Sequence, residues 1–223
     1  MTSIELADVR ITLQVAGLAT LFCILVGIPL AWTLARYRFR GRGLLEALVT
    51  LPLVLPPTVV GYYLLRGLGR SSPVGRFLED DVGARLVFTW EGAAIGAAVL
   101  SAPLLIRTAQ AAFEQVDPEV ERVAATLGHS RLGIFFTVTL PLAIRGVGAA
   151  IALAFARAAG EFGATIMVAG NIPGKTRTLS VAVYDAVQAG DLQRANATAL
   201  VLIAISLLSL LAFSQATGLL GRR

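Results

Sequence analysis

The feature that most constrains the fold is an uncharged run from Ile11 to Ala35, which lies between Arg10 and Arg36. Its 25 residues exceed the roughly 20 that an α-helix needs to cross the hydrocarbon core of a bilayer. The composition agrees, because 56% of the 223 residues are hydrophobic and only 15% are charged, whereas a soluble domain carries about 25% charged residues. The sequence therefore predicts an all-α membrane protein.

The other apolar segments predict a bundle of about five membrane spans within a single domain of residues 1–223. The spans are expected at residues 11–35, 46–66, 86–107, 134–160 with an extension to 169, and 195–220. Residues 132–170 allow two interpretations, since one helix of that length would be roughly 58 Å long. Either a helix leaves the membrane and breaks near Gly160, or there are two short crossings. Lysine and arginine counts at the span ends do not decide between five and six spans. We take five, because residues 160–163 resemble one interruption in a long crossing.

The second expected span is interrupted by Pro52, Pro56 and Pro57. Each proline removes a backbone donor and disfavours helix at the residue before it. Such a break is tolerated at membrane depth only where other protein or a wet cavity satisfies the freed carbonyls. We therefore expect this span to be broken and to lie inside the bundle. The segment Arg36–Arg42 before it holds four arginines and two aromatic residues, which is typical of a cytoplasmic loop at the headgroup level.

Several classes of function are excluded by what the chain lacks. The net charge is +5, but the arginines stand at the ends of apolar runs, where they contact membrane lipid, and form no stripe for nucleic acid. Cys23 and His129 are the only residues of their kinds, so no disulfide or metal cluster can be assembled from them. Residues 170–176 differ from a phosphate-binding loop by having three residues between the glycines instead of four. We therefore expect no enzyme activity and no bound cofactor.

Residues 117–133 predict two short helices joined at an elbow outside the membrane. Asp117 and Pro118 followed by acidic residues are typical of a helix start. Apolar residues at positions 120, 123, 124 and 127 then share one helix face. Gly128 stands where this helix would end, and a second short helix is expected from about Ser130. From physical reasoning alone, this segment could be an interfacial elbow that merely joins two spans.

The spacing around the elbow resembles a known family. Gly128 is followed by nine residues, Val138, one residue and Leu140-Pro141, which is similar to the coupling loop of bacterial ABC importer permeases. Longer similarities to the molybdate permeases are found at residues 51–57, 160–166 and 171–174. The resemblance as a whole covers residues 11–215. One position departs from the family pattern, since Arg122 stands where the family consensus has glutamate. Glu121 lies one residue earlier, as it does in the molybdate branch.

The resemblance implies a homodimer of five-span subunits in the bacterial cytoplasmic membrane. Each subunit would insert its coupling loop into one of two cytoplasmic ATPase subunits, which use the ATP, and a periplasmic or extracellular binding protein would deliver molybdate. The expected ATPase-coupling residues are Glu121, Arg122, Ala124, Ala125, Gly128, His129, Leu140 and Pro141. A tungstate or sulfate permease is the alternative within the family. A stand-alone channel or secondary carrier is the alternative outside it, but such a protein needs no protruding loop.

Arg157 and Glu161 are charged residues four positions apart within an apolar segment. Charges at membrane depth are costly and are often functional. One hypothesis places both residues with Pro56 and Pro57 along the anion pathway, where Arg157 would supply positive potential and Glu161 would restrain it. The other hypothesis is a pair that locks adjacent spans together.

Overall fold

The computed structural model describes residues 5–220, except for the side chains of residues 214 and 216–220. All regular elements in this range are helices, and no strand occurs in it. Four of these helices are long and apolar enough to cross a membrane, and the number becomes five if one bent pair counts as a single span. The expected all-α bundle is therefore confirmed, whereas five spans within one domain remain a prediction.

The first long helix and the third long helix each contain a π-helical turn. The first consists of α1 (Leu6–Phe22), η1 (Cys23–Gly27) and α2 (Ile28–Arg36), and the third of α8 (Arg131–Ile134), η2 (Phe135–Thr139) and α9 (Leu140–Ala159). Each π-helical turn contains the carbonyl four residues before a proline, Pro29 in α2 and Pro141 in α9. A proline cannot donate to that carbonyl, and the wider turn accommodates the mismatch.

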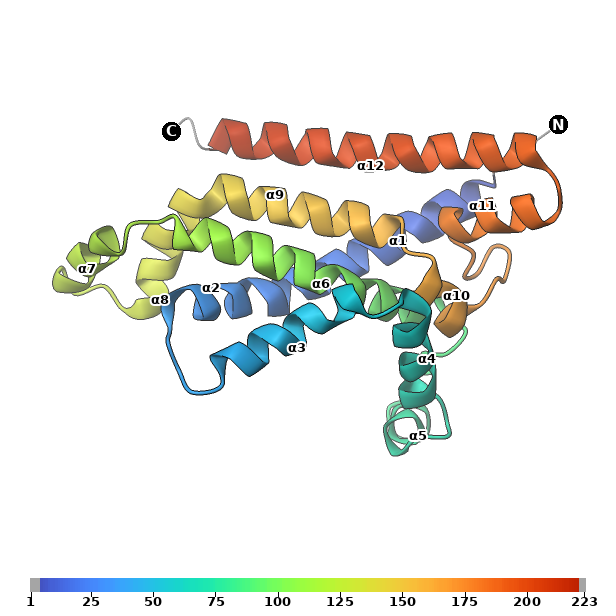
Figure 1. Cartoon of the computed structure of the whole chain (residues 1–223), viewed down its shortest axis with the longest axis horizontal. Coiled ribbons are helices and arrows are strands. Elements are labelled where there is room, and N and C mark those ends of the chain that lie inside the picture. Colours follow the sequence, from blue (N-terminus) through green and yellow to red (C-terminus); the bar gives the residue numbers. More distant parts are fainter. Residues whose placement is uncertain (1–4, 221–223) are drawn as a thin grey trace.

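The second expected span is broken at its prolines, as the sequence predicts. Helix α3 (Arg42–Val54) and helix α4 (Pro57–Leu68) meet at 109°. Pro52 lies inside α3, and Pro56 and Pro57 form the corner (Figure 1). The short helix α5 (Pro73–Asp80) follows, begun by Ser72, whose hydroxyl accepts a bond of 2.8 Å from the amide of residue 75.

The helices differ from the expected elements in three places. The third span does not begin at residue 86 but at Trp90, because the Thr89 hydroxyl caps its helix, and α6 (Trp90–Glu114) runs seven residues past Arg107. The second helix of the elbow is not separate, because α8 continues through η2 into α9 without a break. The interval before the last span holds an additional helix, α11 (Leu179–Gln188), ahead of α12 (Leu192–Leu220).

The long apolar segment at residues 132–170 breaks near Gly160, as the first of the two interpretations predicts, whereas the exit of its helix from the membrane remains a prediction. Its helix α9 ends at Ala159, Gly160 follows as the C-cap, and α10 (Gly163–Ala169) begins after two further residues. The chain therefore changes direction at the interruption that the sequence indicates. Figure 1 shows α10 beside α4, at the end of the molecule opposite α7 (Pro118–Thr126).

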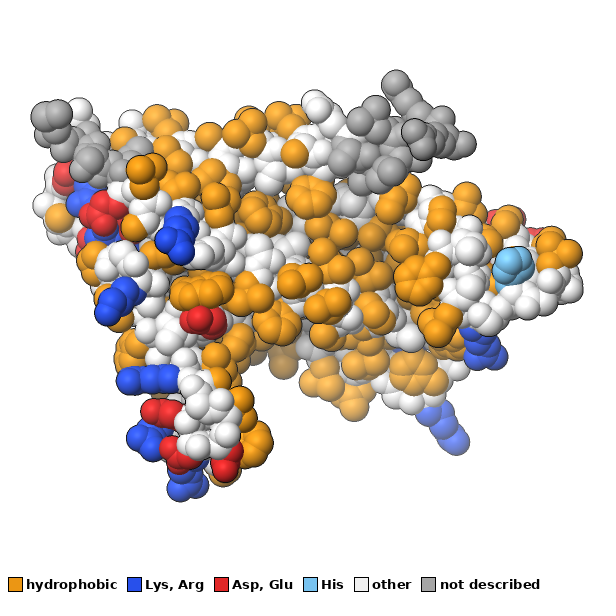
Figure 2. Space-filling view, turned by 180° about the vertical axis from the view of Figure 1, so that it is seen from behind, with side chains coloured by type: hydrophobic (Ala, Val, Ile, Leu, Met, Phe, Trp, Pro, Cys, Tyr) orange, Lys and Arg blue, Asp and Glu red, His pale blue; other side chains and the backbone are white. Residues whose placement is uncertain are grey.

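Helix α6 is the centre of the bundle, packed against α1, α2, α9 and α10. Small residues permit these close contacts: Ala93, Ala94 and Ala97 are fully buried, and Gly96 faces Ala164 of α10. Helix α12 packs against α9 and α11, and few of its described side chains between Leu192 and Phe213 are buried. Hydrophobic side chains cover the middle of the face shown in Figure 2, and charged side chains gather toward its ends and on α5. That distribution suits a belt of lipid.

Candidate functional site

In the elbow predicted at residues 117–133, helix α7 begins and ends where the sequence predicts. The Asp117 carboxylate accepts a 2.8 Å bond from the amide of Glu119 and so begins α7. After α7 ends, Gly128 adopts a φ of +87°, which glycine reaches without the steric cost that other residues meet. The amide of His129 then bonds to the carbonyl of Ala124 at 3.3 Å. This left-handed cap turns the chain toward Ser130, whose hydroxyl caps α8.

The large apolar side chains of the elbow are exposed in the single chain. Val120, Val123 and Leu127 are 45%, 53% and 75% exposed, while Ala124 is buried. The sequence predicts one apolar face that includes Ala124, yet only this small residue packs inward. Together with the exposed residues Ala125 and His129, the three large side chains form a ridge at one end of the molecule. Exposed apolar patches of this kind are typical of interaction sites.

Glu121 points into the molecule instead of outward. Its Oε1 accepts bonds from Nε of Arg36 at 3.0 Å and from the hydroxyl of Thr139 at 2.6 Å, and Nη2 of Arg36 lies 2.9 Å away. The same Nη2 donates to the carbonyl of Val116 at 3.0 Å. Glu121 therefore ties α7 to the end of α2 and to the π-helical turn η2, and Arg36 extends these contacts to the turn after α6.

The remaining expected coupling residues differ in their surroundings. Arg122 is exposed and pairs with Glu119 at 3.0 Å on the same helix. Leu140 packs partly into the main hydrophobic cluster, whereas Pro141 is exposed on the side of α9. Ala125, Gly128 and His129 lie on the surface of the elbow. Contact of any of these residues with an ATPase remains a prediction.

The two broken helices contact each other at the opposite end of the molecule. A β-carbon added to Gly163 would lie 2.8 Å from Cβ of Pro57, and one added to Gly61 would lie 2.8 Å from Cα of Ala164. The first turns of α4 and α10 therefore cross with almost no space between their backbones. The structure places Pro57 beside the interruption at residues 160–163, and both are remote from the elbow (Figure 1).

Arg157 and Glu161 form an ion pair of 2.6 Å. Glu161 is 2% exposed, and its second oxygen accepts a 2.9 Å bond from the amide of Ala164, so that it caps the first turn of α10. Its backbone carbonyl also accepts from the hydroxyl of Ser180. The Glu161 carboxylate is thus fully engaged within the protein, whereas about a third of the Arg157 side chain is exposed.

A buried ion network near the first turn of α1 was not identified from the sequence. Arg177 is 4% exposed, and it pairs with Glu5 at 2.6 Å, with Asp8 at 3.1 Å and with Asp185 at 3.7 Å. Burial alone would lower the pKa of Arg177, but the hydrogen bonds that its guanidinium donates to Asp8 and Glu5 outweigh burial, and the pKa lies above its ordinary value. The network joins α1, α11 and the loop between α10 and α11. The sequence signal that could have revealed this network is the acidic residue in the first turn of α1.

Sequence comparisons agree with this arrangement. Residues 24–223 match the family described as the binding-protein-dependent transport system inner membrane component. The chain is 45% identical over 212 residues to the molybdenum transport system permease protein ModB of Escherichia coli K12, covering 95% of this chain and 93% of that protein. It is 40% identical over 218 residues to the sulfate transport system permease protein CysT of Salmonella typhimurium, covering 97% and 78%.

Solved structures share the fold at low sequence identity. A bacterial ABC transporter that imports alginate matches with a TM-score of 0.76 at 18% identity, over 96% of this chain and 80% of the other. An inward-facing MetNI methionine ABC transporter matches with a TM-score of 0.75 at 18% identity, over 96% and 94%. With the elbow, the broken helices and the similarity to ModB along almost its whole length, the chain belongs to the family of binding-protein-dependent transport system inner membrane components.

Proposed function

We propose that this chain is the permease subunit of an ATP-driven importer that carries molybdate across the cytoplasmic membrane. The observation that carries the proposal is the α7 elbow, which exposes an apolar ridge and is fixed to the bundle by Glu121. A channel or carrier working alone has no use for such a ridge. The similarity to ModB over 95% of the chain supports molybdate as the transported anion.

The geometry suggests how force from an ATPase reaches the pathway. A partner that seats on Val120, Val123 and Leu127 moves α7, and the Arg36–Glu121–Thr139 contacts carry that movement into α2 and η2. Because η2 continues into α9, the displacement reaches the interruption at residues 160–163, where α10 meets α4. Rigid helices with defined breaks are then sufficient to switch the transport cavity between its inward-open and outward-open forms.

We infer the partners from the family and from the exposed surfaces. The proposed assembly holds two copies of this five-span domain, two cytoplasmic ATPase subunits and an external binding protein. Support for a second copy comes from α3, which has no buried residue within the single chain and exposes Leu44, Leu48, Leu51 and Val54. Support for a binding protein comes from the alginate transporter, which has been solved with its periplasmic protein.

The test is transport by the purified components. Proteoliposomes containing this chain and its ATPase, with binding protein outside and ATP inside, are expected to accumulate radioactive molybdate. Vesicles without the ATPase are expected to accumulate none. Uptake by this chain alone would establish a channel or carrier and overturn the proposal. Failure of cysteine crosslinks from position 125 or 128 to capture the ATPase would remove the elbow from the coupling mechanism.

Sulfate is a second candidate for the transported anion, because the chain is 40% identical to CysT over 97% of its length. Molybdate and sulfate are both tetrahedral and doubly charged, so the permease can discriminate poorly between them by charge alone. Competition separates the candidates: unlabelled sulfate in equal amount should leave molybdate uptake almost unchanged if molybdate is the substrate. The affinities of the partner binding protein for the two anions provide an independent measurement.

A further inference from the structure

Helix α3 faces α6 with a stripe of polar residues. Positions 42, 46 and 50 are four residues apart and so share one face of α3. They contact positions 107, 110 and 114, which share one face of α6 in the same way. Figure 1 shows α3 along the edge of the bundle, with its last residues joined to α4. We call the six residues the α3–α6 clamp: Arg42, Glu46, Thr50, Arg107, Gln110 and Glu114.

The guanidinium of Arg107 is the centre of this clamp. Its Nη2 donates to the hydroxyl of Thr50 at 2.9 Å and to the carbonyl of Glu46 at 3.2 Å, and its Nε donates to the same hydroxyl at 3.2 Å. Its Nη1 donates to the side-chain oxygen of Gln110 at 3.3 Å and lies 3.7 Å from the Glu46 carboxylate. Arg107 therefore joins two successive turns of α3 to its own helix.

Polar contacts supply much of what attaches α3 to the bundle. No residue of α3 is buried, although Leu45 and Val49 contact the main hydrophobic cluster. Water can replace hydrogen bonds at a small net cost, whereas exposure of buried apolar surface costs free energy in proportion to its area. The clamp is therefore a contact that can open where water enters between α3 and α6.

The other end of the broken span is held in a different way. Beyond the corner at Pro56 and Pro57, α4 crosses α10 so closely that a β-carbon at Gly61 or Gly163 would meet its neighbour at 2.8 Å. Such close packing does not yield gradually. Leu55, at the corner, is extended with a φ of −74° and a ψ of 142°. A helix fixed at one end by a non-helical corner and attached elsewhere by polar bonds has the features of a hinged element.

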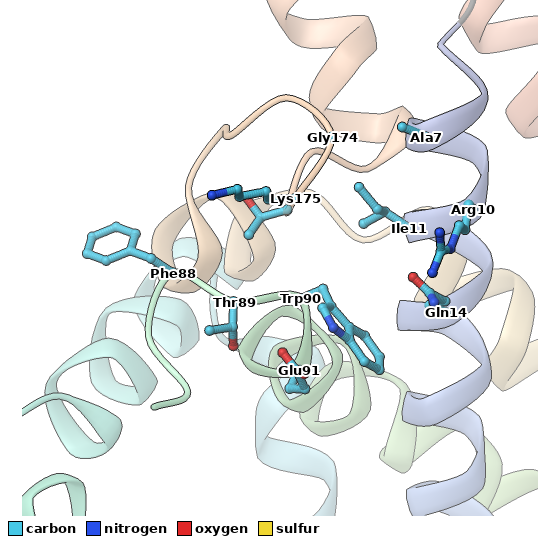
Figure 3. A pocket seen from close by; sticks show the side chains of 11 residues that line it. Ala7, Arg10, Ile11, Gln14, Phe88, Thr89, Trp90, Glu91, Gly174 and Lys175 are labelled. Carbon is cyan, nitrogen blue, oxygen red and sulfur yellow. The ribbon is translucent and has the colours of Figure 1, made fainter. Parts of the chain in front are cut away.

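The cations at the opposite end of the molecule show that a cation need not hold a helix in place. Arg10 and Lys175 line a cavity of about 440 Å³ between the starts of α1 and α6 and the loop after α10 (Figure 3). Within residues 5–220, neither of these side chains forms an ion pair. Arg107 differs from them, because its donors are directed at oxygens of a second helix.

We propose that α3 rotates about the corner at Pro56 and Pro57, and that Arg107 is the positioning residue that holds α3 against α6 between these movements. The role of the movement rests on the proposed function. The clamp lies near the arginine-rich segment Arg36–Arg42, which is expected on the cytoplasmic side, and α3 also carries the face proposed for the second copy. Separation of α3 from α6 in both copies therefore opens the anion pathway toward the cytoplasm.

The test measures the distance between α3 and α6 in the full complex of permease and ATPase in nanodiscs. Spin labels are attached through Leu48→Cys and Ala111→Cys, at positions that are exposed on α3 and on α6, and the buried Cys23 is changed by Cys23→Ala. Excess unlabelled chain leaves one labelled copy in each complex. Double electron–electron resonance then reports the ratio of separated to clamped distances.

Arg107→Gln should raise that ratio on the order of tenfold, because charge-assisted bonds to two turns of α3 are lost. Arg107→Lys should raise it less, although one ammonium group cannot reproduce the fork of donors. Thr50→Val should also raise the ratio, whereas Thr50→Ser, which keeps the hydroxyl, should not. The first matched control is Arg40→Gln, which removes the same charge from an exposed arginine. The second is Thr33→Val, since the Thr33 hydroxyl bonds to the carbonyl of Leu30 within its own helix at 2.8 Å.

Transport in proteoliposomes is the second readout. Arg107→Gln should lower the molybdate carried per ATP, because α3 then separates from α6 without regard to the state of the ATPase. Arg107→Lys should restore part of this loss. Arg40→Gln and Thr33→Val should match the wild type in both measurements.

Several outcomes would overturn the inference. Unchanged distances in both Arg107→Gln and Thr50→Val would do so, as would equal ratios for Thr50→Val and Thr50→Ser. A loss of transport with unchanged distances would assign Arg107 to another role. If Arg107→Gln fails to assemble with the ATPase, the two Thr50 variants decide. Because the distances require no transport, a wild-type complex that carries no molybdate would refute the proposed function, and the distances would still decide whether the clamp exists.

Discussion

Replacing Glu121 with glutamine tests whether the elbow works as a lever attached to the bundle. The change keeps the shape of the side chain and removes its charge. Glu121 accepts from Arg36 at 3.0 Å and from Thr139 at 2.6 Å, and its side chain is 17% exposed, against 12% for Arg36. Hydrogen bonds to charged groups contribute about 1.5–3 kcal/mol each and neutral ones about 0.5–1.5 kcal/mol.

The expected loss is about 1–3 kcal/mol in the free energy that holds α7 against the bundle, after allowance for partial solvent screening. At 1.4 kcal/mol per factor of ten, the attached state of the lever becomes roughly 5–150-fold less favoured. The ATPase can still bind the exposed ridge, so hydrolysis should continue. Molybdate carried per ATP hydrolysed in proteoliposomes should therefore fall on the order of tenfold.

The matched control is Glu119→Gln on the same helix. Glu119 pairs with Arg122 at 3.0 Å, but both side chains are more than 60% exposed, so removal of this charge should cost well under 1 kcal/mol. Transport per ATP in this control should equal that of the wild type. The reasoning is refuted if Glu121→Gln transports as efficiently as the control. It is also refuted if that variant loses its ATPase, since Glu121 would then act in docking and not in anchoring.

Three further substitutions have definite expected outcomes. Gly128→Ala places a side chain at a φ of +87° and should cost about 1–2 kcal/mol, so that less ATPase copurifies. Gly17→Ala, which adds its side chain in open space, should not reduce copurification. Gly61→Ala would put Cβ 2.8 Å from the backbone of Ala164, lowering the melting temperature through about 1–3 kcal/mol of overpacking; an unchanged melting temperature would contradict the close crossing. Arg157→Ala leaves the buried Glu161 without its ion-pair partner and should destabilise the protein. The cost should be limited to about 1–3 kcal/mol because Arg157 is partly exposed, and adding Glu161→Gln should restore part of the stability. If Arg157→Ala alone keeps full stability and full uptake, Arg157 has neither role.

Local patterns in the sequence predicted the elements whose causes are local. The uncharged run at residues 11–35 became one long helix, and Asp117, Pro118 and Gly128 began and ended α7 at the expected places. The corner at Pro56 and Pro57 was likewise predictable. In each case, a backbone donor, a cap or an allowed φ value determines the outcome within a few residues.

Contacts between distant parts of the chain could not be predicted in this way. Glu121 was expected among the ATPase-coupling residues, but its bond to Arg36, which lies 85 positions earlier, was not predicted because no short pattern links the two. The pair of Arg177 and Asp8 spans 169 positions. Helix α11 was missed because its polar flanks resemble an ordinary loop, although its buried residues Leu179 and Val181 pack into the bundle.

The π-helical turn η2 also sets the rotational position of α7 about the axis of α9. One extra residue in a π turn rotates everything beyond it by about 100° compared with an unbroken α-helix, since an α turn holds 3.6 residues. Deleting a single residue from Phe135–Thr139 would thus leave a continuous rod but swing the ridge of α7 by about a quarter-turn about the axis of α9. An ATPase seated on this ridge would then push α7 in the wrong direction.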